Sequence, residues 1–197
     1  MIEAEIKVKI DDPEGIRKKI TNFKGHYILS LKHADTYFNM PIGLRDFQET
    51  DEALRIRNST EFDKNKRSNH IKVQNYLTYK DKKLDNITKT REEIEIKIED
   101  ELKIKKLLLK LGFQEILTVI KERELYEIEF RNERIDVLID YLPILGSYFL
   151  ETEILCKTID KIDEVRELIF EFLKDLGIDR NQSIRKSYLE LILEKKR

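Results

Sequence analysis

The sequence predicts an α+β fold: an eight-stranded antiparallel β-barrel that closes on itself, with its helices packed outside. Two observations support this prediction. Eight segments alternate apolar and polar residues with a period of two, as half-buried strands do. The same order of strands and helices occurs in both halves of the chain, and two four-stranded halves that close into one barrel leave no sheet edge exposed.

The strand pattern is clearest at the beginning of the chain. Residues 2–10 place apolar side chains at every even position and charged side chains at 3, 5, 7 and 9. The predicted strands are 2–10, 27–38, 53–58, 70–80, 91–99, 116–130, 133–140 and 149–156. The polar stretches 59–69 and 81–90 have neither a strand nor a helix period, and we expect them to be mobile loops.

Four segments have the signals of helices. The first, 13–23, starts after Asp12 with a proline at its first position. The second and third, 100–111 and 158–176, have apolar residues at helical spacing and stop at Gly112 and Gly177. The last, 183–195, is expected to be the C-terminal helix.

The chain also resembles itself. The segment EAEIK at 3–7 matches EIEIK at 93–97, and Phe23 matches Phe113 at the same offset. We therefore expect one domain over residues 1–197, built from two duplicated halves at about 1–90 and 91–180 and completed by the helix at 183–195.

Charge and composition exclude several classes of protein. The 38 Lys and Arg residues almost cancel the 39 Asp and Glu residues, so the net charge is -1. A protein that coats nucleic acid or an acidic membrane by bulk charge needs a large excess of positive charge. No segment has the roughly 18 apolar residues of a membrane span. The single cysteine, Cys156, cannot form an intrachain disulfide. We expect a cytoplasmic protein that binds neither nucleic acid nor membrane.

The charged faces of the strands allow two interpretations. In most antiparallel sheets such a face is solvated. However, Arg55 and Arg57 share one strand face, as do Glu3 and Glu5 in the first strand. Like charges so placed repel each other unless an opposite charge lies between them. On the inner wall of a barrel, such pairs would suit a polyphosphate and its divalent metals.

Several motifs on these strands and in the predicted C-terminal helix occur in a fixed order along the chain. They are ExExK at 3–7, DTYF at 35–38, LRIR at 54–57, TYK at 78–80, REEIE at 91–95, KER at 121–123, Asp140 before a Leu-Gly turn, ETE at 151–153 and SYLEL at 187–191. This ordered set resembles that of the CYTH family, the triphosphate tunnel enzymes, and the resemblance covers essentially the whole chain. This resemblance also implies the eight-stranded tunnel.

The resemblance implies roles for individual residues. The proposed ligands of Mg²⁺ or Mn²⁺, which prefer carboxylate oxygens, are Glu3, Glu5, Asp140, Glu151 and Glu153. The proposed triphosphate-binding residues are Lys7, Arg55, Arg57, Lys80, Arg91, Lys121, Arg123 and Lys186. The proposed catalytic residues are Glu3, Glu5 and Lys7. Arg91 either binds a phosphate or pairs with Glu93 or Glu95, and Arg185 is an alternative to Lys186.

The resemblance is strongest to members similar to class IV adenylyl cyclases, which convert ATP to cyclic AMP and pyrophosphate. A triphosphatase acting on inorganic, thiamine or nucleoside triphosphate is the alternative, and a polyphosphate or nucleotide binder without turnover is a third. The family implies a monomer or a homodimer.

The sequence departs from the family pattern at two places. Residues 147–150 are about one residue longer than expected, which predicts a bulge or register shift. Asp81-Lys82-Lys83 replaces a usual Gly-Pro.

Overall fold

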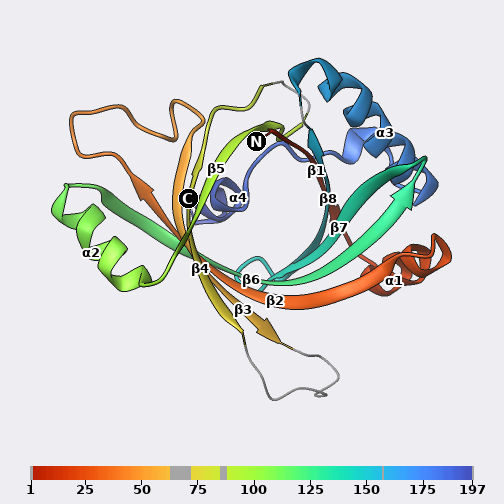
Figure 1. Ribbon diagram of the computed structural model, residues 1–197, viewed down its shortest axis with the longest axis horizontal. Helices are drawn as coiled ribbons and strands as arrows, with labels where there is room; N and C mark the ends of the chain where they lie inside the picture. Colours follow the sequence, from red (N-terminus) through yellow and green to blue (C-terminus); the bar gives the residue numbers. More distant parts are fainter. Residues whose placement is uncertain (1, 63–71, 85–87, 157, 197) are drawn as a thin grey trace.

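The computed structural model describes residues 2–62, 72–84, 88–156 and 158–196 (Figure 1). Its strands are β1 (Ile2–Ile10), β2 (His26–Asn39), β3 (Ala53–Phe62), β4 (Val73–Lys80), β5 (Arg91–Ile98), β6 (Gln114–Phe130), β7 (Glu133–Leu142) and β8 (Ser147–Cys156). Its α-helices are α1 (Pro13–Asn22), α2 (Glu101–Lys110), α3 (Ile162–Asp175) and α4 (Tyr188–Lys195), with short 3₁₀ helices at Ile159–Lys161 and Arg180–Gln182.

The strands form one closed barrel in the order β1-β5-β4-β3-β2-β6-β7-β8, and every pair is antiparallel. The predicted fold class is therefore confirmed. The element order strand, helix and three strands occurs twice, and the equivalent strands of the two halves pair with each other, β1 with β5 and β2 with β6. This symmetry is what a duplication would produce, and the duplication itself stays a prediction.

Two predicted helices begin later than expected. A 3₁₀ turn precedes α3, and α4 begins at Tyr188 instead of residue 183. For α4 the reason is pairing with β1, because Ser183 bridges to Val8 and the Ile184 N–H donates to the Lys7 carbonyl at 2.7 Å. Ser187 then starts α4 with a capping box.

The predicted loops also differ in part. Residues 59–62 belong to β3, and the rest of the stretch 59–69 lies outside the described residues.

The bulge expected at 147–150 is not present, because the β7–β8 pairing runs without a shift from Asp136 opposite Glu153 to Leu142 opposite Ser147. In the turn before β8, Gly146 adopts a positive φ of 62°, which glycine tolerates without strain.

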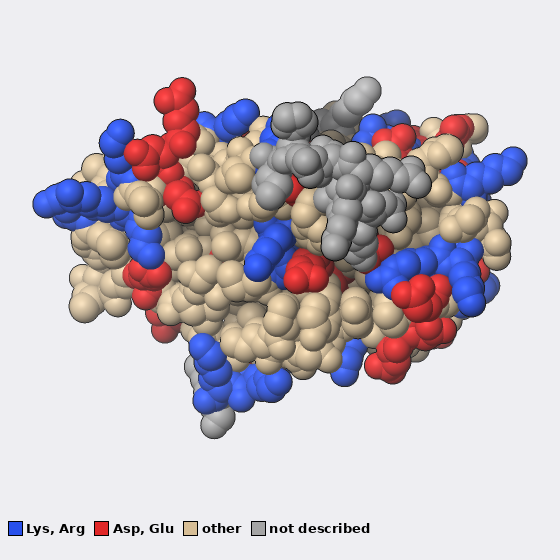
Figure 2. All heavy atoms as spheres, turned by 90° about the horizontal axis from the view of Figure 1, so that it is seen from below, with Lys and Arg blue, Asp and Glu red and all other residues tan. Residues whose placement is uncertain are grey.

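The surface has charges of both signs. On the face shown in Figure 2, acidic and basic side chains are interspersed around an uncharged area, and neither sign forms a continuous patch. Among the described residues, no helix is long and apolar enough to cross a membrane.

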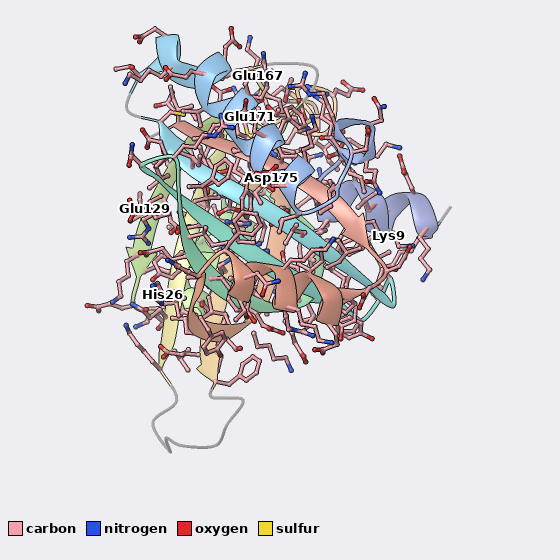
Figure 3. The ribbon with its side chains drawn as sticks, turned by 90° about the vertical axis from the view of Figure 1, so that its right-hand side faces the viewer. Lys9, His26, Glu129, Glu167, Glu171 and Asp175 are labelled. Atoms are coloured by element: carbon pink, nitrogen blue, oxygen red, sulfur yellow. The ribbon has the colours of Figure 1, made fainter. Side chains whose placement is uncertain are left out.

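The main apolar core lies outside the barrel. The even-numbered residues of β1, such as Ile6 and Val8, pack with outward-facing residues of β6, β7 and β8 under α1 and α3. Glu167, Glu171 and Asp175 lie on the solvent side of α3 (Figure 3). A smaller cluster packs α2 onto the outer face of β3 and β4. Helices α1, α2 and α3 therefore cover the apolar outer face, and the charged face of the strands is the inner wall. Contrary to the expectation that the helices pack outside, α4 packs against inward-facing strand residues.

Candidate functional site

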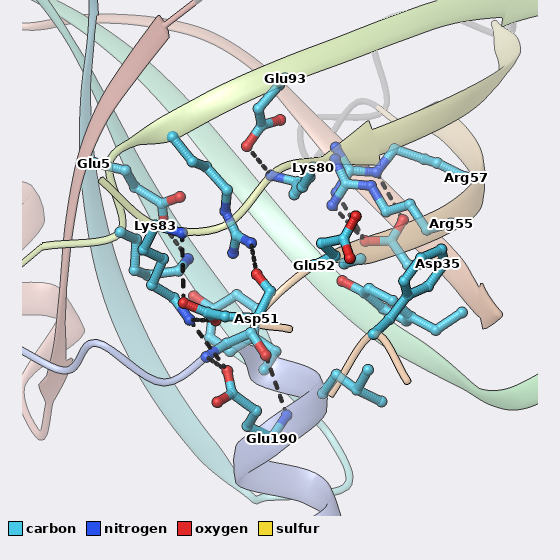
Figure 4. Close-up of a pocket in the computed structure, with 18 of the residues that line it drawn as sticks. Glu5, Asp35, Asp51, Glu52, Arg55, Arg57, Lys80, Lys83, Glu93 and Glu190 are labelled. Carbon is cyan, nitrogen blue, oxygen red and sulfur yellow. Dashed lines mark hydrogen bonds and ion pairs between the residues drawn. The ribbon is translucent and has the colours of Figure 1, made fainter. Parts of the chain in front are cut away.

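A cavity of about 700 Å³ lies inside the barrel (Figure 4). A smaller cavity of about 300 Å³ lies beside it. Arg57, Glu95, Arg123 and Glu153 line both cavities. The two cavities are therefore neighbouring parts of one tunnel.

Most of the predicted site residues lie in this tunnel. Among the described residues, the lining of the larger cavity includes Glu3, Glu5, Arg55, Arg57, Lys80, Arg91, Lys121, Arg123, Glu151 and Glu153. It does not include Lys7, Asp140 or Lys186. The strand period explains the inward set, because residues two apart on a strand project from the same face.

Three carboxylates meet on adjacent strands. One oxygen each from Glu5, Glu151 and Glu153 lies within 4.8 Å of the others. Burial, together with the neighbouring Glu151, raises the pKa of Glu5, and burial with the nearby Glu3 raises the pKa of Glu153 well above its usual value. Carboxylate oxygens of this kind are the donors that Mg²⁺ and Mn²⁺ prefer. The donor set therefore fits a hard divalent ion.

Asp140 has a different environment from these glutamates. It is fully buried and accepts two hydrogen bonds from Arg123, at 2.7 and 2.6 Å, and one from Lys121 at 3.1 Å. Burial alone would raise its pKa, but Arg123 and Lys121 hold the pKa below its usual value. In this structure Asp140 therefore orients two cations. Its side chain is not among the described residues that line the cavity.

Glu151 connects this pair of cations to the carboxylate cluster. Arg123 also donates to Glu151, and the Lys121 ammonium lies 3.9 Å from it. Burial alone would raise the pKa of Glu151, but Lys89, Lys121 and Arg123 hold it well below its usual value. Burial and the neighbouring Arg123 lower the pKa of Lys121 to about 8.

The opposite wall has its own cationic pair. Arg57 makes a forked contact to Asp35, with both distances 2.7 Å, and Arg55 donates to the same carboxylate at 3.3 Å. Burial would raise the pKa of Asp35, but Arg57 and Arg55 hold it well below its usual value. Asp35 thus keeps two neighbouring guanidinium groups side by side on the wall, where forked contacts to phosphate oxygens are favourable.

Two further predicted cations lie between these walls. Lys80 pairs with Glu93. Burial alone would raise the pKa of Glu93, but Lys80 and Arg55 lower it to about 2. Arg91 donates to the carbonyl oxygens of Asp81 and Asp51, at 3.3 and 3.5 Å. The structure thus gives Arg91 backbone partners that the sequence did not indicate, and its side chain still lines the cavity.

Lys7 and Lys186 lie apart from the cavity lining. Lys7 is completely buried, and its ammonium donates to the Lys186 carbonyl. The Lys186 side chain is half exposed and pairs with Glu194 at 2.6 Å. The alternative residue, Arg185, contacts Asp51 on the cavity wall at 3.2 Å, so it lies nearer to the cavity than the Lys186 ammonium does.

Besides Asp35, which was part of a quoted motif without an assigned role, sequence reasoning missed three residues of the site. Lys89 comes from the stretch expected to be a mobile loop, yet it is buried and bridges Glu5 and Glu151, the latter at 3.0 Å. Lys83, from the same stretch, is buried and pairs with Asp51 (Figure 4). Tyr188 from α4 also lines the cavity. The stretch 81–90 lacks periodicity, so the only available signal was its lysine content.

Comparisons with known proteins agree with this geometry. A model of the CYTH domain matches residues 1–188. A Methanocaldococcus jannaschii protein, named as a proposed adenylate cyclase, is 44% identical over 192 residues, which is 97% of this chain and 98% of that protein.

Solved structures give the same result. A Pyrococcus horikoshii OT3 protein is 39% identical with a TM-score of 0.83, covering 98% of this chain and 99% of its own. A Hippeastrum protein, a proposed adenylyl cyclase described as having a dominant triphosphatase activity, shares the fold at 17% identity and a TM-score of 0.62, with coverage of 98% and 96%. With the tunnel and its carboxylate cluster, these matches show that the chain belongs to the CYTH domain family.

Proposed function

We propose that the protein is a divalent-metal-dependent enzyme that acts on a triphosphate inside the barrel, and that it converts ATP to cyclic AMP and pyrophosphate. The observation that carries the proposal is the tunnel wall. Three clustered carboxylates face a cavity that is also lined by cations from β3, β4, β6 and the segment before β5. A triphosphate and its metal need both kinds of group in one place.

Two groups of residues would bind the metal and the phosphates. Glu5, Glu151 and Glu153 would hold Mg²⁺ or Mn²⁺, with Glu3 as a further carboxylate on the same wall. When bound, the ion supplies Lewis-acid polarisation of phosphate oxygens. Arg55, Arg57, Lys80, Lys89, Lys121 and Arg123 would bind the phosphates and stabilise charge on their oxygens.

The cyclase reaction requires room for a nucleoside. The cavity volume of about 700 Å³ is within the range typical of small-molecule sites. Part of the lining is apolar, including Phe38, Phe47 and Ile116. This apolar surface favours a substrate with an organic group over inorganic triphosphate. In the proposed reaction the 3′-hydroxyl of ATP attacks the α-phosphorus and pyrophosphate leaves.

A triphosphatase is the second candidate, since the Hippeastrum relative is described as having that dominant activity. The same cations and carboxylates would serve water attack on the terminal phosphorus.

A product assay with ATP, thiamine triphosphate and inorganic triphosphate, each with Mg²⁺ or Mn²⁺, tests the proposal. We expect cyclic AMP and pyrophosphate from ATP. Phosphate release without a cyclic nucleotide would replace the cyclase with a triphosphatase. Tight binding of all three compounds without turnover would indicate a binding protein.

A further inference from the structure

The ring of Tyr188 has an unusual set of neighbours. Tyr188 is the first residue of α4 and lines the cavity while almost completely buried. Three ammonium groups lie within 6 Å of its ring centroid: Lys7 at 4.2 Å, Lys121 at 5.1 Å and Lys89 at 5.8 Å. They come from β1, β6 and the segment before β5, so one aromatic ring joins cations from three separate parts of the chain.

Three buried ammonium groups so close together repel one another. The face of an aromatic ring carries partial negative charge and attracts cations within about 6 Å of its centroid, more strongly where water is excluded. The ring therefore offsets part of this repulsion. Lys89 and Lys121 line the cavity, whereas Lys7 is fully buried and is fixed by the Lys186 carbonyl.

The position of the ring is itself well determined. The Tyr188 hydroxyl donates to Asp140 at 2.9 Å. The ring packs edge-on against Phe149, with centroids 5.2 Å apart. The capping box between Ser187 and Glu190 fixes the first turn of α4. These contacts hold the ring in one orientation from three sides.

Helix α4 occupies the end of the barrel where the three ammonium groups surround the Tyr188 ring. Tyr188 and Ile192 pack with Tyr37, Val119 and Phe149 in one apolar cluster. These three strand residues share the inward-facing parity of Asp35, Lys121 and Glu151. In Figure 1, α4 lies within the outline of the barrel. The ring is therefore at the inner end of the cavity, on the first turn of the helix that fills this part of the barrel.

We propose that Tyr188 is a positioning residue whose ring holds Lys89 and Lys121 toward the terminal phosphate of a triphosphate at the α4 end of the cavity. This inference rests on the proposed triphosphate-binding function. The terminal phosphate carries the most negative charge of the three, so it is the group best matched to this concentration of ammonium groups. The substrate would then lie with its terminal phosphate at α4 and its organic group farther along the tunnel.

The test is the affinity for inorganic triphosphate, measured by calorimetry in chelator-treated buffer, for variants of the full chain. Tyr188→Phe keeps the ring and removes the hydroxyl, and we expect its affinity within about threefold of the wild-type value. Tyr188→Leu removes the ring, and we expect at least a tenfold loss. Ile192→Ala is the matched control, because Ile192 belongs to the same apolar cluster and is not one of the contacts that orient the ring. We expect its affinity within threefold of wild type, although its melting temperature falls.

A second series of variants tests the ring without the risk that Tyr188→Leu misfolds. Phenylalanine analogues with increasing fluorination at position 188 weaken the negative face of the ring while nearly preserving its shape. A stepwise loss of affinity with fluorination supports the role of the ring. Constant affinity across the series, or an equal loss in Ile192→Ala, would overturn it. A wild-type chain that does not bind triphosphate would instead overturn the proposed function, and this role with it.

Discussion

The two faces of the barrel wall are both buried, but they differ in what burial does. Glu5 and Ile6 are neighbours on β1 and are almost equally inaccessible to water. Ile6 faces outward into the apolar core under α1 and α3, where burial stabilises the fold. Glu5 faces inward among ions, where burial raises its pKa. The outer face provides stability, whereas the inner face keeps charges desolvated for a ligand at a cost in stability.

The largest effect should come from the inner face. Glu5→Gln keeps the shape of the side chain and removes one charged oxygen from the cluster. We expect metal-dependent turnover to fall by more than about 100-fold, because loss of an outer-sphere partner alone typically costs 10–100-fold. Steady-state rates across Mg²⁺ and Mn²⁺ concentrations measure this. Unchanged activity would show that Glu5 is not a metal ligand.

The adjacent outward residue should give the opposite result. Ile6→Ala leaves a cavity in the main core, and the free energy of unfolding should fall by about 2–4 kcal/mol. The turnover number of the folded fraction should stay near the wild-type value. Denaturant unfolding and active-site titration measure the two quantities. A variant of normal stability, or one that is folded but inactive, would contradict this division between the faces.

Lys89 allows a finer test of the inner face, because its ammonium contacts Glu5 and Glu151, two of the clustered carboxylates. A metal ion must compete with it for these oxygens. Lys89→Met should therefore raise Mn²⁺ affinity about tenfold, or about 1.4 kcal/mol, in calorimetry without triphosphate. The same variant should bind triphosphate more weakly. Lys83→Met is the control, since Lys83 pairs with Asp51 and not with the cluster, and its Mn²⁺ affinity should not rise.

The smallest expected effect is the pH dependence of metal binding. The raised pKa values of Glu5 and Glu153 favour their protonated forms, so protons compete with the metal. Affinity should rise as pH rises through these pKa values and level off above them. Calorimetry in buffers of different ionisation enthalpy should detect proton release on binding. The release should be smaller in Glu153→Gln, and an equal release in this variant would point to other groups.

Local pattern accounts for most of what could be predicted. The period of two located all eight strands within a few residues, and the signals at Asp12 and Gly112 placed the first two helices closely. The start of α4 was missed because residues 183 and 184 pair with β1, a contact distant in sequence. The ordered motifs likewise identified most of the residues that line the tunnel.

The sequence by itself determined which residues share a face, because strand parity depends only on local spacing. It could not determine which face closes around the tunnel, since that depends on where α1 and α3 pack. It also could not distinguish Asp140, which orients Arg123 and Lys121, from the cavity-lining Glu151. Lys89 and Tyr188 belong to the site only because the closed barrel brings them to β1, β6 and β8. Such contacts have no local signal, so only the tertiary structure decided them.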